Sequence, residues 1–147
     1  MFKHILVPTD GSDLSLATVA RAVSFAKEAG ARVTLFYAEA PTPSFYAGVG
    51  AVAAPHVLQE ARERLDGAAQ HILDAAQQLA QDAGVSCERV VLEGHKPYVL
   101  IIQAAEQQGC DLIFMASHGR RGMDALLLGS ETNKVLTHSK IPVLVYR

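Results

Sequence analysis

Five short apolar runs alternate along this chain with segments whose apolar residues recur at helical spacing. The runs are Met1–Val7, Ala31–Ala38, Val85–Leu92, Asp111–Ala116 and Ile141–Tyr146. Their length and their β-branched and aromatic residues are typical of buried strands. Strands that alternate with helices form a parallel sheet with helices on both faces, joined by right-handed crossovers. We therefore predict an α/β fold: a three-layer α/β/α open sheet of five mostly parallel strands with about four helices.

Residues that begin and end helices support this division. Ser12 is a good N-cap for a first helix that ends at Gly30, and Pro97 suits the first turn of a third helix. The longest helical pattern runs from 55 to 83. Its apolar stripe would also suit a coiled coil, but alanine at every second seam position favours a helix that lies on a sheet. The last helix is predicted over Ser130–Ser139.

The segment 40–55 differs from the rest, because it holds three prolines, two glycines and no charged residue. We predict a mobile loop here. The loop contains Gly48-Val-Gly50-x-x-Ala53, which matches part of the dinucleotide-binding fingerprint. That fingerprint needs a strand directly before it and a helix directly after it. Other residues, two prolines among them, separate it from the preceding strand, so we set the match aside.

Length, charge and cysteine content narrow the possible functions. The 147 residues, half of them hydrophobic, suit one domain with a full core. A net charge of −2 argues against a nucleic-acid-binding protein, which needs a basic face. The apolar runs are too short to span a membrane. The two cysteines form no CxxC pair and no signal-peptide pattern is present, which indicates a reduced, cytoplasmic setting. The six histidines show no metal-ligand spacing, so we expect no metal held by protein side chains.

Polar residues follow two of the predicted strands at the point where each ends. Pro8-Thr9-Asp10-Gly11-Ser12 follows the first, and Ala116-Ser117-His118-Gly119 follows the fourth. Ligands of open parallel sheets bind beyond the carboxyl ends of the strands, where the strand order reverses. If these two strands are neighbours at that point, both loops face one crevice. The predicted strand order is therefore 3-2-1-4-5.

The residues after the fourth strand are typical of an anion site. Gly119 has no Cβ, so backbone N–H groups can approach a phosphate. Gly129-Ser130 begins the last helix, where unpaired N–H groups, the helix dipole and the Ser130 hydroxyl favour an anion. Arg120 supplies a forked cationic donor, whereas Asp10 suits ribose hydroxyls or a divalent ion that bridges phosphates. A plainer interpretation stays open, in which the glycines end a strand and Ser130 is only an N-cap. The P-loop pattern GxxxxGK[ST] is absent.

Together these residues resemble the universal stress protein family, over essentially the whole chain. The family's phosphate signature is G-x-x-G, nine residues and then G-[ST]. Here it runs Ala116-Ser-His-Gly119, nine residues and Gly129-Ser130, so an alanine replaces the first glycine. The segments HILVPTDGS, DLIFMASHGRRG and SKIPVLVYR also match. The Ala116 methyl group would crowd the nucleotide, or would be harmless if its backbone φ is negative.

The resemblance implies an adenine nucleotide alpha hydrolase-like fold that binds ATP, with magnesium or manganese held mainly by the phosphates. Pro8, Thr9 and Asp10 would line the adenosine side. The backbone near Ala38 would meet adenine. The phosphate side would be formed by the signature and its neighbours: Met115, Ala116, Ser117, His118, Gly119, Arg120, Gly122, Gly129, Ser130, Glu131 and Thr132.

Three functions are compatible with these residues. The first is a cytoplasmic ATP-binding module that regulates a stress response. The second is a slow ATPase or nucleotidyl transferase, for which His118 without an orienting partner is a weak base. The third is a dimeric protein-interaction module with an empty cleft. In each case Ile141–Tyr146 lies at a sheet edge and is predicted to pair with a second copy in a homodimer, as the resemblance also implies. The sequence does not name any other protein partner.

Overall fold

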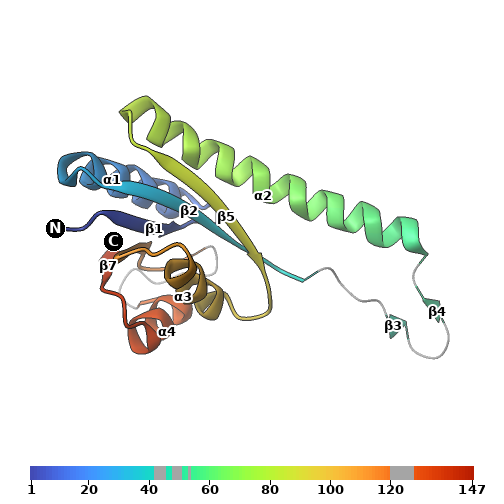
Figure 1. Ribbon diagram of the computed structural model, residues 1–147. Coiled ribbons are helices and arrows are strands. Elements are labelled where there is room, and N and C mark those ends of the chain that lie inside the picture. The colour runs from blue at the N-terminus through green and yellow to red at the C-terminus, as the bar shows by residue number, and fades with distance from the viewer. Residues whose placement is uncertain (42–45, 48–50, 53, 120–127) are drawn as a thin grey trace.

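The computed structural model describes residues 1–41, 46–47, 51–52, 54–119 and 128–147 (Figure 1). The strands of the main sheet are β1 His4–Pro8, β2 Arg32–Glu39, β5 Cys87–Glu93, β6 Leu112–Ala116 and β7 Val143–Tyr146. The helices are α1 Asp13–Ala29, α2 Pro55–Ala83, α3 Pro97–Gln107 and α4 Ser130–His138. Two short strands, β3 Tyr46–Ala47 and β4 Ala51–Val52, pair with each other in antiparallel orientation.

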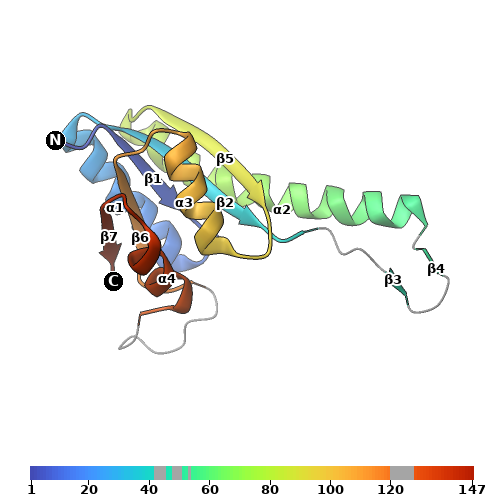
Figure 2. The same cartoon turned by 60° about the horizontal axis from the view of Figure 1, so that its bottom comes forward.

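The main sheet has the order β5-β2-β1-β6-β7, and its neighbouring strands all run parallel. In chain order the five strands are therefore arranged 3-2-1-4-5, which confirms the predicted order. Helices α1 and α2 cover one face of the sheet, and α3 and α4 cover the other (Figures 1 and 2). The three-layer α/β/α architecture is thus confirmed. The strand order reverses between β1 and β6, so the carboxyl ends of these two strands lie side by side.

The central strands are buried on both faces, which explains their continuous apolar runs. Val7 and Leu35 pack in the core with α1 and α2, whereas Leu6 and Phe36 on the same strands pack in the core with α3 and α4. All four side chains are at most 1% exposed. Because side chains alternate along a strand, each residue belongs to the core opposite that of its neighbour in sequence.

The predicted helix ends are confirmed at the clearest signals. Ser12 Oγ accepts a hydrogen bond from Ser15 N at 3.2 Å and so caps α1. Gly30 and Gly84 follow α1 and α2 with φ angles of 63° and 70°, in the left-handed region that favours glycine. The pattern from 55 to 83 forms one helix. Its second half packs on α1 and the sheet through Leu73, Ala76 and Ala80, whereas no residue of α2 before Ala69 is buried.

Some strand boundaries differ from the predicted ones. The first strand begins at His4 rather than Met1, and the third begins at Cys87, two residues later than predicted. The last begins at Val143, because Pro142 has no N–H to donate to a ladder. Apolar runs mark where a strand is buried, and the backbone pairs over a shorter stretch.

The segment 40–55 contains the paired strands β3 and β4, in which Tyr46 lies opposite Val52. Aromatic and β-branched residues have high strand propensity, which explains pairing within a segment rich in proline and glycine. Residues 42–45, 48–50 and 53 lie outside the described residues, and the mobility of the segment stays a prediction. Helix α2 extends well past the end of the sheet, and β3 and β4 lie near its far end (Figures 1 and 2). In the described part of the chain, none of the helices has the length and hydropathy needed to cross a membrane.

Candidate functional site

The loops that follow β1 and β6 meet in space. An ideal Cβ placed on Gly119 would lie 2.6 Å from Asp10 Oδ2. Real Cβ atoms do not come that close to an oxygen, so the absence of a side chain at Gly119 is what lets the two loops approach. Two predicted site residues that are far apart in the sequence are therefore neighbours in the fold.

The loop after β1 is attached to the start of α1 by Ser15. Its Oγ lies 2.5 Å from Thr9 Oγ1 and accepts a hydrogen bond from Asp10 N at 3.1 Å. Thr9 N donates to Phe36 O at 2.9 Å, which ties the same loop to β2. Thr9 is buried, so its hydroxyl holds the loop in place rather than binding a ligand.

Sequence analysis does not single out Ser15, although a signal for it exists. It lies on the buried side of α1 together with Val19 and Ala22, and it is 3% exposed. A buried hydroxyl without a hydrogen bond costs free energy, so a serine in an apolar stripe indicates a nearby polar partner. Here that partner is the loop that carries Thr9 and Asp10.

The Asp10 carboxylate is oriented by the turn that it begins. Oδ1 accepts a hydrogen bond from Ser12 N at 2.9 Å, as in an Asx turn, and Gly11 between them has a φ of 77°. Oδ2 lies on the side of Gly119. The site therefore holds a fixed negative charge beside the loop after β6. Such a charge repels phosphate and suits ribose hydroxyls or a cation.

The residues directly after β6 contact the residues at the start of α4. Gly129 N donates to Ser117 O at 2.7 Å, and Thr132 Oγ1 donates to Ala116 O at 3.0 Å. A Cβ on Gly129 would come within 3.0 Å of His118 Cα, so this glycine also permits a close approach. These contacts hold the start of α4 beside the end of β6.

The first turn of α4 presents backbone N–H groups at this place. The helix begins at Ser130, and its N-cap, Gly129, has no side chain with which to cap it. The N–H groups of Ser130, Glu131 and Thr132 have no partner within the helix, as in any first turn. Together with the helix dipole they favour an anion here.

Some predicted site residues use their side chains elsewhere. Met115 is 6% exposed and packs in the core with α3 and α4. The Glu131 carboxylate accepts hydrogen bonds from Tyr98 N at 2.8 Å and from Lys134 Nζ at 2.7 Å, so it satisfies the start of α3. Met115 and Glu131 can therefore serve a ligand only through their backbone.

His118 contacts its neighbour in the chain. Its Nδ1 lies 3.1 Å from Ser117 Oγ, and no carboxylate of the described residues bonds to its ring. A general base needs such an orienting partner, so the geometry does not favour base catalysis by His118. Arg120 and Gly122, which sequence analysis places in the site, lie outside the described residues.

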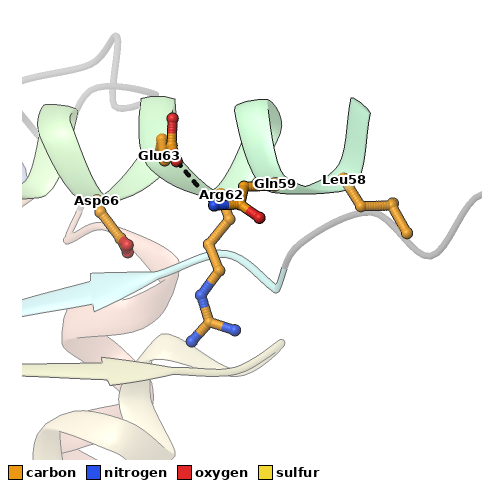
Figure 3. A pocket seen from close by; sticks show the side chains of 5 residues that line it. All are labelled: Leu58, Gln59, Arg62, Glu63 and Asp66. Atoms are coloured by element: carbon orange, nitrogen blue, oxygen red, sulfur yellow. Dashed lines mark hydrogen bonds between the residues drawn. The ribbon is translucent and has the colours of Figure 1, made fainter. Parts of the chain in front are cut away.

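A pocket of about 450 Å³ lies away from this site, along the first half of α2 (Figure 3). None of the predicted site residues that the structure describes lines it. Its lining residues are Leu58, Gln59, Arg62, Glu63 and Asp66. The candidate site at the strand ends rests on the Asp10–Gly119 approach. Residues 120–127 lie outside the described residues.

Comparison with known proteins identifies the family. A model of the universal stress protein family matches residues 1–147. The chain belongs to this family. A universal stress protein of Methanocaldococcus jannaschii is 33% identical over 147 residues, covering 100% of this chain and 83% of the relative. Universal stress protein YxiE of Bacillus subtilis is 34% identical over 152 residues, with 100% of both chains covered. The resemblance identified from the sequence is confirmed.

Solved structures share the fold of this universal stress protein. Protein MJ0577 of Methanocaldococcus jannaschii has a TM-score of 0.81 at 27% identity, covering 99% of this chain and 95% of the other. UspA from Lactobacillus plantarum has a TM-score of 0.78 at 28% identity, covering 99% and 98%. A universal stress protein in complex with cAMP has a TM-score of 0.72 at 28% identity, covering 99% and 97%. These neighbours confirm the predicted α/β fold.

Proposed function

We propose that this universal stress protein binds an adenine nucleotide, ATP, between the loops after β1 and β6, and acts as a cytoplasmic stress-response module. The observation that carries the proposal is the approach of Asp10 to Gly119, beside the start of α4. It brings together a carboxylate, a close backbone approach and a helix N-terminus. The family member solved with cAMP supports an adenine nucleotide as the ligand, since it shares the fold at 28% identity.

The phosphates would bind at the start of α4. The N–H groups of Ser130 and Glu131 and the helix dipole would face them, and the exposed Ser130 hydroxyl would add a donor. Arg120 would add two parallel N–H bonds through its planar guanidinium. Gly119 has no Cβ, which would otherwise lie 2.6 Å from Asp10 Oδ2.

The adenosine half would lie over the ends of β1 and β2. Phe36 O points toward β1, where it accepts a hydrogen bond from Thr9 N. Backbone groups two residues apart point to the same side of a strand, so the N–H and C=O of Ala38 point to the same side as those of Phe36. Because β1 ends at Pro8, these groups of Ala38 lie beyond the end of β1. An adenine edge has both donors and acceptors and would pair with them. Asp10 would bind the ribose hydroxyls.

Magnesium or manganese would be held mainly by the ATP phosphates. In the described residues no three His, Cys, Asp or Glu side chains lie close enough together to hold a metal ion. Any hydrolysis would be slow, because among the described residues the His118 ring contacts the Ser117 hydroxyl and no carboxylate. ATP would thus act as a ligand that changes what the protein binds, rather than as a substrate.

The test is calorimetric titration with ATP of the wild-type protein and of Asp10→Asn. The amide oxygen can still accept the Ser12 N–H, but the charge is gone. We expect wild-type binding and a loss of about tenfold or more in the variant, since hydrogen bonds to a charged group contribute about 1.5–3 kcal/mol. Asp13→Asn, an exposed acid in the first turn of α1, is the matched control and should bind normally.

Two outcomes would count against the proposal. Wild-type protein that binds no ATP would favour the alternative function, a protein-interaction module with an empty cleft. Unchanged affinity in Asp10→Asn would remove Asp10 from the site.

We also propose that two chains pair through β7. The carbonyls of Pro142 and Tyr146 accept hydrogen bonds from the N–H groups of Ile113 in β6 and of Ser117 directly after it. Because the backbone groups of successive residues point to opposite sides of a strand, those of Val143 and Val145 point to the outer edge. A second copy in antiparallel orientation would satisfy them about a two-fold axis.

Val143→Pro tests the pairing, because it removes an outer-edge N–H and none from the ladder with β6. We expect it to sediment as a monomer. Val91→Pro is the matched control: it removes an N–H that points outward from β5, the opposite edge strand, and should leave assembly unchanged. A dimer that survives Val143→Pro would place the interface elsewhere.

A further inference from the structure

Strand β5 forms one edge of the main sheet, with β2 as its one neighbour among the described strands (Figure 1). Gly94 N, directly after β5, donates to Glu39 O at 2.9 Å, so the even-numbered residues of β5 bond to β2. The N–H and C=O groups of Cys87, Arg89 and Val91 therefore point away from the sheet. None of these backbone groups has a hydrogen-bond partner among the described residues.

The edge formed by β5 lacks several features that usually prevent a further strand from pairing. Natural edge strands are often very short, contain proline or carry a bulge. Strand β5 has seven residues, contains no proline and pairs with β2 at consecutive positions without a bulge. The other edge strand, β7, has four residues and follows Pro142. An exposed edge as long as β5 is a template for a further strand.

A charged side chain in the middle of an edge strand also prevents pairing, because an added strand would bury the charge. Arg89 occupies that position in β5, but its charge is already paired. Its guanidinium donates to Asp74 at 2.6 Å, to Gln77 at 3.0 Å and to Gln70, all on α2. The Arg89 side chain is only 23% exposed. An added strand would therefore cover a neutral pair and not an isolated charge.

The other side chains of β5 indicate the chemistry of the strand that fits this edge. Val90 and Leu92 are half-buried and pack on the core formed with α3 and α4. Side chains of residues that lie opposite each other are on the same face of a sheet, so the residues opposite Val90 and Leu92 should be apolar. Glu88 on the same face pairs with Arg32 at 3.4 Å. Because the Glu88 and Arg89 charges are both paired within the chain, an uncharged segment fits best.

We propose that β5 binds an extended, uncharged segment of another protein, which pairs with it in antiparallel orientation and lengthens the sheet by one strand. The segment would bond to the outward N–H and C=O groups of Cys87, Arg89 and Val91, and its alternate apolar side chains would lie beside Val90 and Leu92. A second copy of this chain fits less well. Given the β7 pairing proposed above, pairing through β5 as well would join the molecules into an open-ended chain.

The probe is an acetylated and amidated heptapeptide, Thr-Val-Thr-Val-Thr-Val-Thr, with N-methyl groups on its valines. Methylation leaves only the threonine N–H groups free, so the peptide can pair along one edge and does not aggregate. Antiparallel pairing places the threonines opposite Cys87, Arg89 and Val91, and the valines beside Val90 and Leu92. The peptide is titrated into ¹⁵N-labelled protein. We expect saturable shifts of the amide resonances of Cys87, Arg89 and Val91.

A second peptide and two variants are the controls. The same peptide with N-methyl groups on its threonines should bind at least about tenfold more weakly, because antiparallel pairing then puts the valines over Arg89 instead of beside Val90 and Leu92. Val91→Pro removes an outward N–H and none from the ladder with β2, and should weaken binding of the probe about fivefold or more, the scale of one hydrogen bond. Val143→Pro, at the opposite edge, should leave binding at β5 unchanged.

Three results would overturn the proposal. The first is no saturable shift at Arg89 and Val91 up to about 1 mM peptide. The second is equal binding of the two peptides, a comparison made on the wild-type protein that holds even where Val91→Pro fails to fold. The third is growth of the wild-type protein beyond a dimer in sedimentation that Val91→Pro abolishes, because a second copy would then occupy β5. Shifts at β5 in a protein that is monomeric or binds no ATP would support this proposal and contradict only the proposed function.

Discussion

Gly119→Ala tests whether the two loops meet as the structure shows. The new Cβ would lie 2.6 Å from Asp10 Oδ2, so the carboxylate must retreat by about 0.8 Å to reach ordinary contact at 3.4 Å. Asp10 has little freedom to do this, because its other oxygen accepts the Ser12 N–H at 2.9 Å. A retreat of that size stretches this hydrogen bond beyond its useful range.

The cost follows from the bond that is lost. A hydrogen bond to a charged group contributes about 1.5–3 kcal/mol, and because Asp10 is only partly buried we expect about 1 kcal/mol of lost stability without nucleotide. ATP affinity should fall by at least about tenfold, since the displaced carboxylate no longer meets the ribose and the methyl group occupies the approach to the phosphates. Urea unfolding and calorimetric titration measure the two effects.

A double-mutant cycle with Asp10→Ala tests whether the contact with the Asp10 carboxylate causes the loss of stability in Gly119→Ala. Without the carboxylate, the methyl group at position 119 has room, so Gly119→Ala should cost close to nothing in that background. Gly67→Ala is the matched control: a Cβ there meets nothing within 4 Å, and alanine in place of glycine inside α2 should stabilise by about 0.5–1 kcal/mol. An equal cost of Gly119→Ala with and without Asp10 would refute the reasoning.

Three further predictions follow from the side chains around the site and from the buried core. Glu131→Ala should lower the free energy of unfolding by about 1 kcal/mol, since Tyr98 N and Lys134 lose their acceptor, while ATP affinity stays the same; a large loss of affinity would mean that the carboxylate serves the ligand. Burial lowers the pKa of His4 in the folded protein, so His4 takes up a proton in the unfolded state first as the pH falls below 6.5. The free energy of unfolding should therefore decrease with falling pH, by at most about 1.4 kcal/mol per pH unit from this residue. Urea unfolding at several pH values should show that His4→Gln lacks this pH dependence. Burial raises the pKa of Cys110 to about 12, so its thiol should resist iodoacetamide in the native protein and react on unfolding, as mass spectrometry would show.

The sequence was sufficient to predict the sheet and the approach of the loops that follow β1 and β6. Buried parallel strands require continuous apolar runs, so runs such as Leu112–Ala116 could be found directly. The polar residues after β1 and β6 then predicted that these two strands are neighbours, because only adjacent strand ends can share one crevice. Gly30 and Gly84 fixed helix ends because few other residues adopt a positive φ.

Other features depend on distances that no local pattern encodes. Glu131 satisfies the start of α3 because α3 and α4 pack side by side, whereas the family resemblance placed this residue at the ligand. The side chain of Met115 lies in the core because strand parity, and not proximity to the signature, decides which way it points.

The central claim is that an adenine nucleotide binds where the loops after β1 and β6 meet. The most direct measurement is a titration of ¹⁵N-labelled protein with ATP, followed by the backbone amide resonances. We predict saturable shifts confined to Asp10, Gly119, Ser130 and Glu131 and to residues next to them in the chain, with the amides of α2 unchanged. Saturable shifts along α2 with none at Asp10 or Ser130, or no shifts at all, would contradict the account.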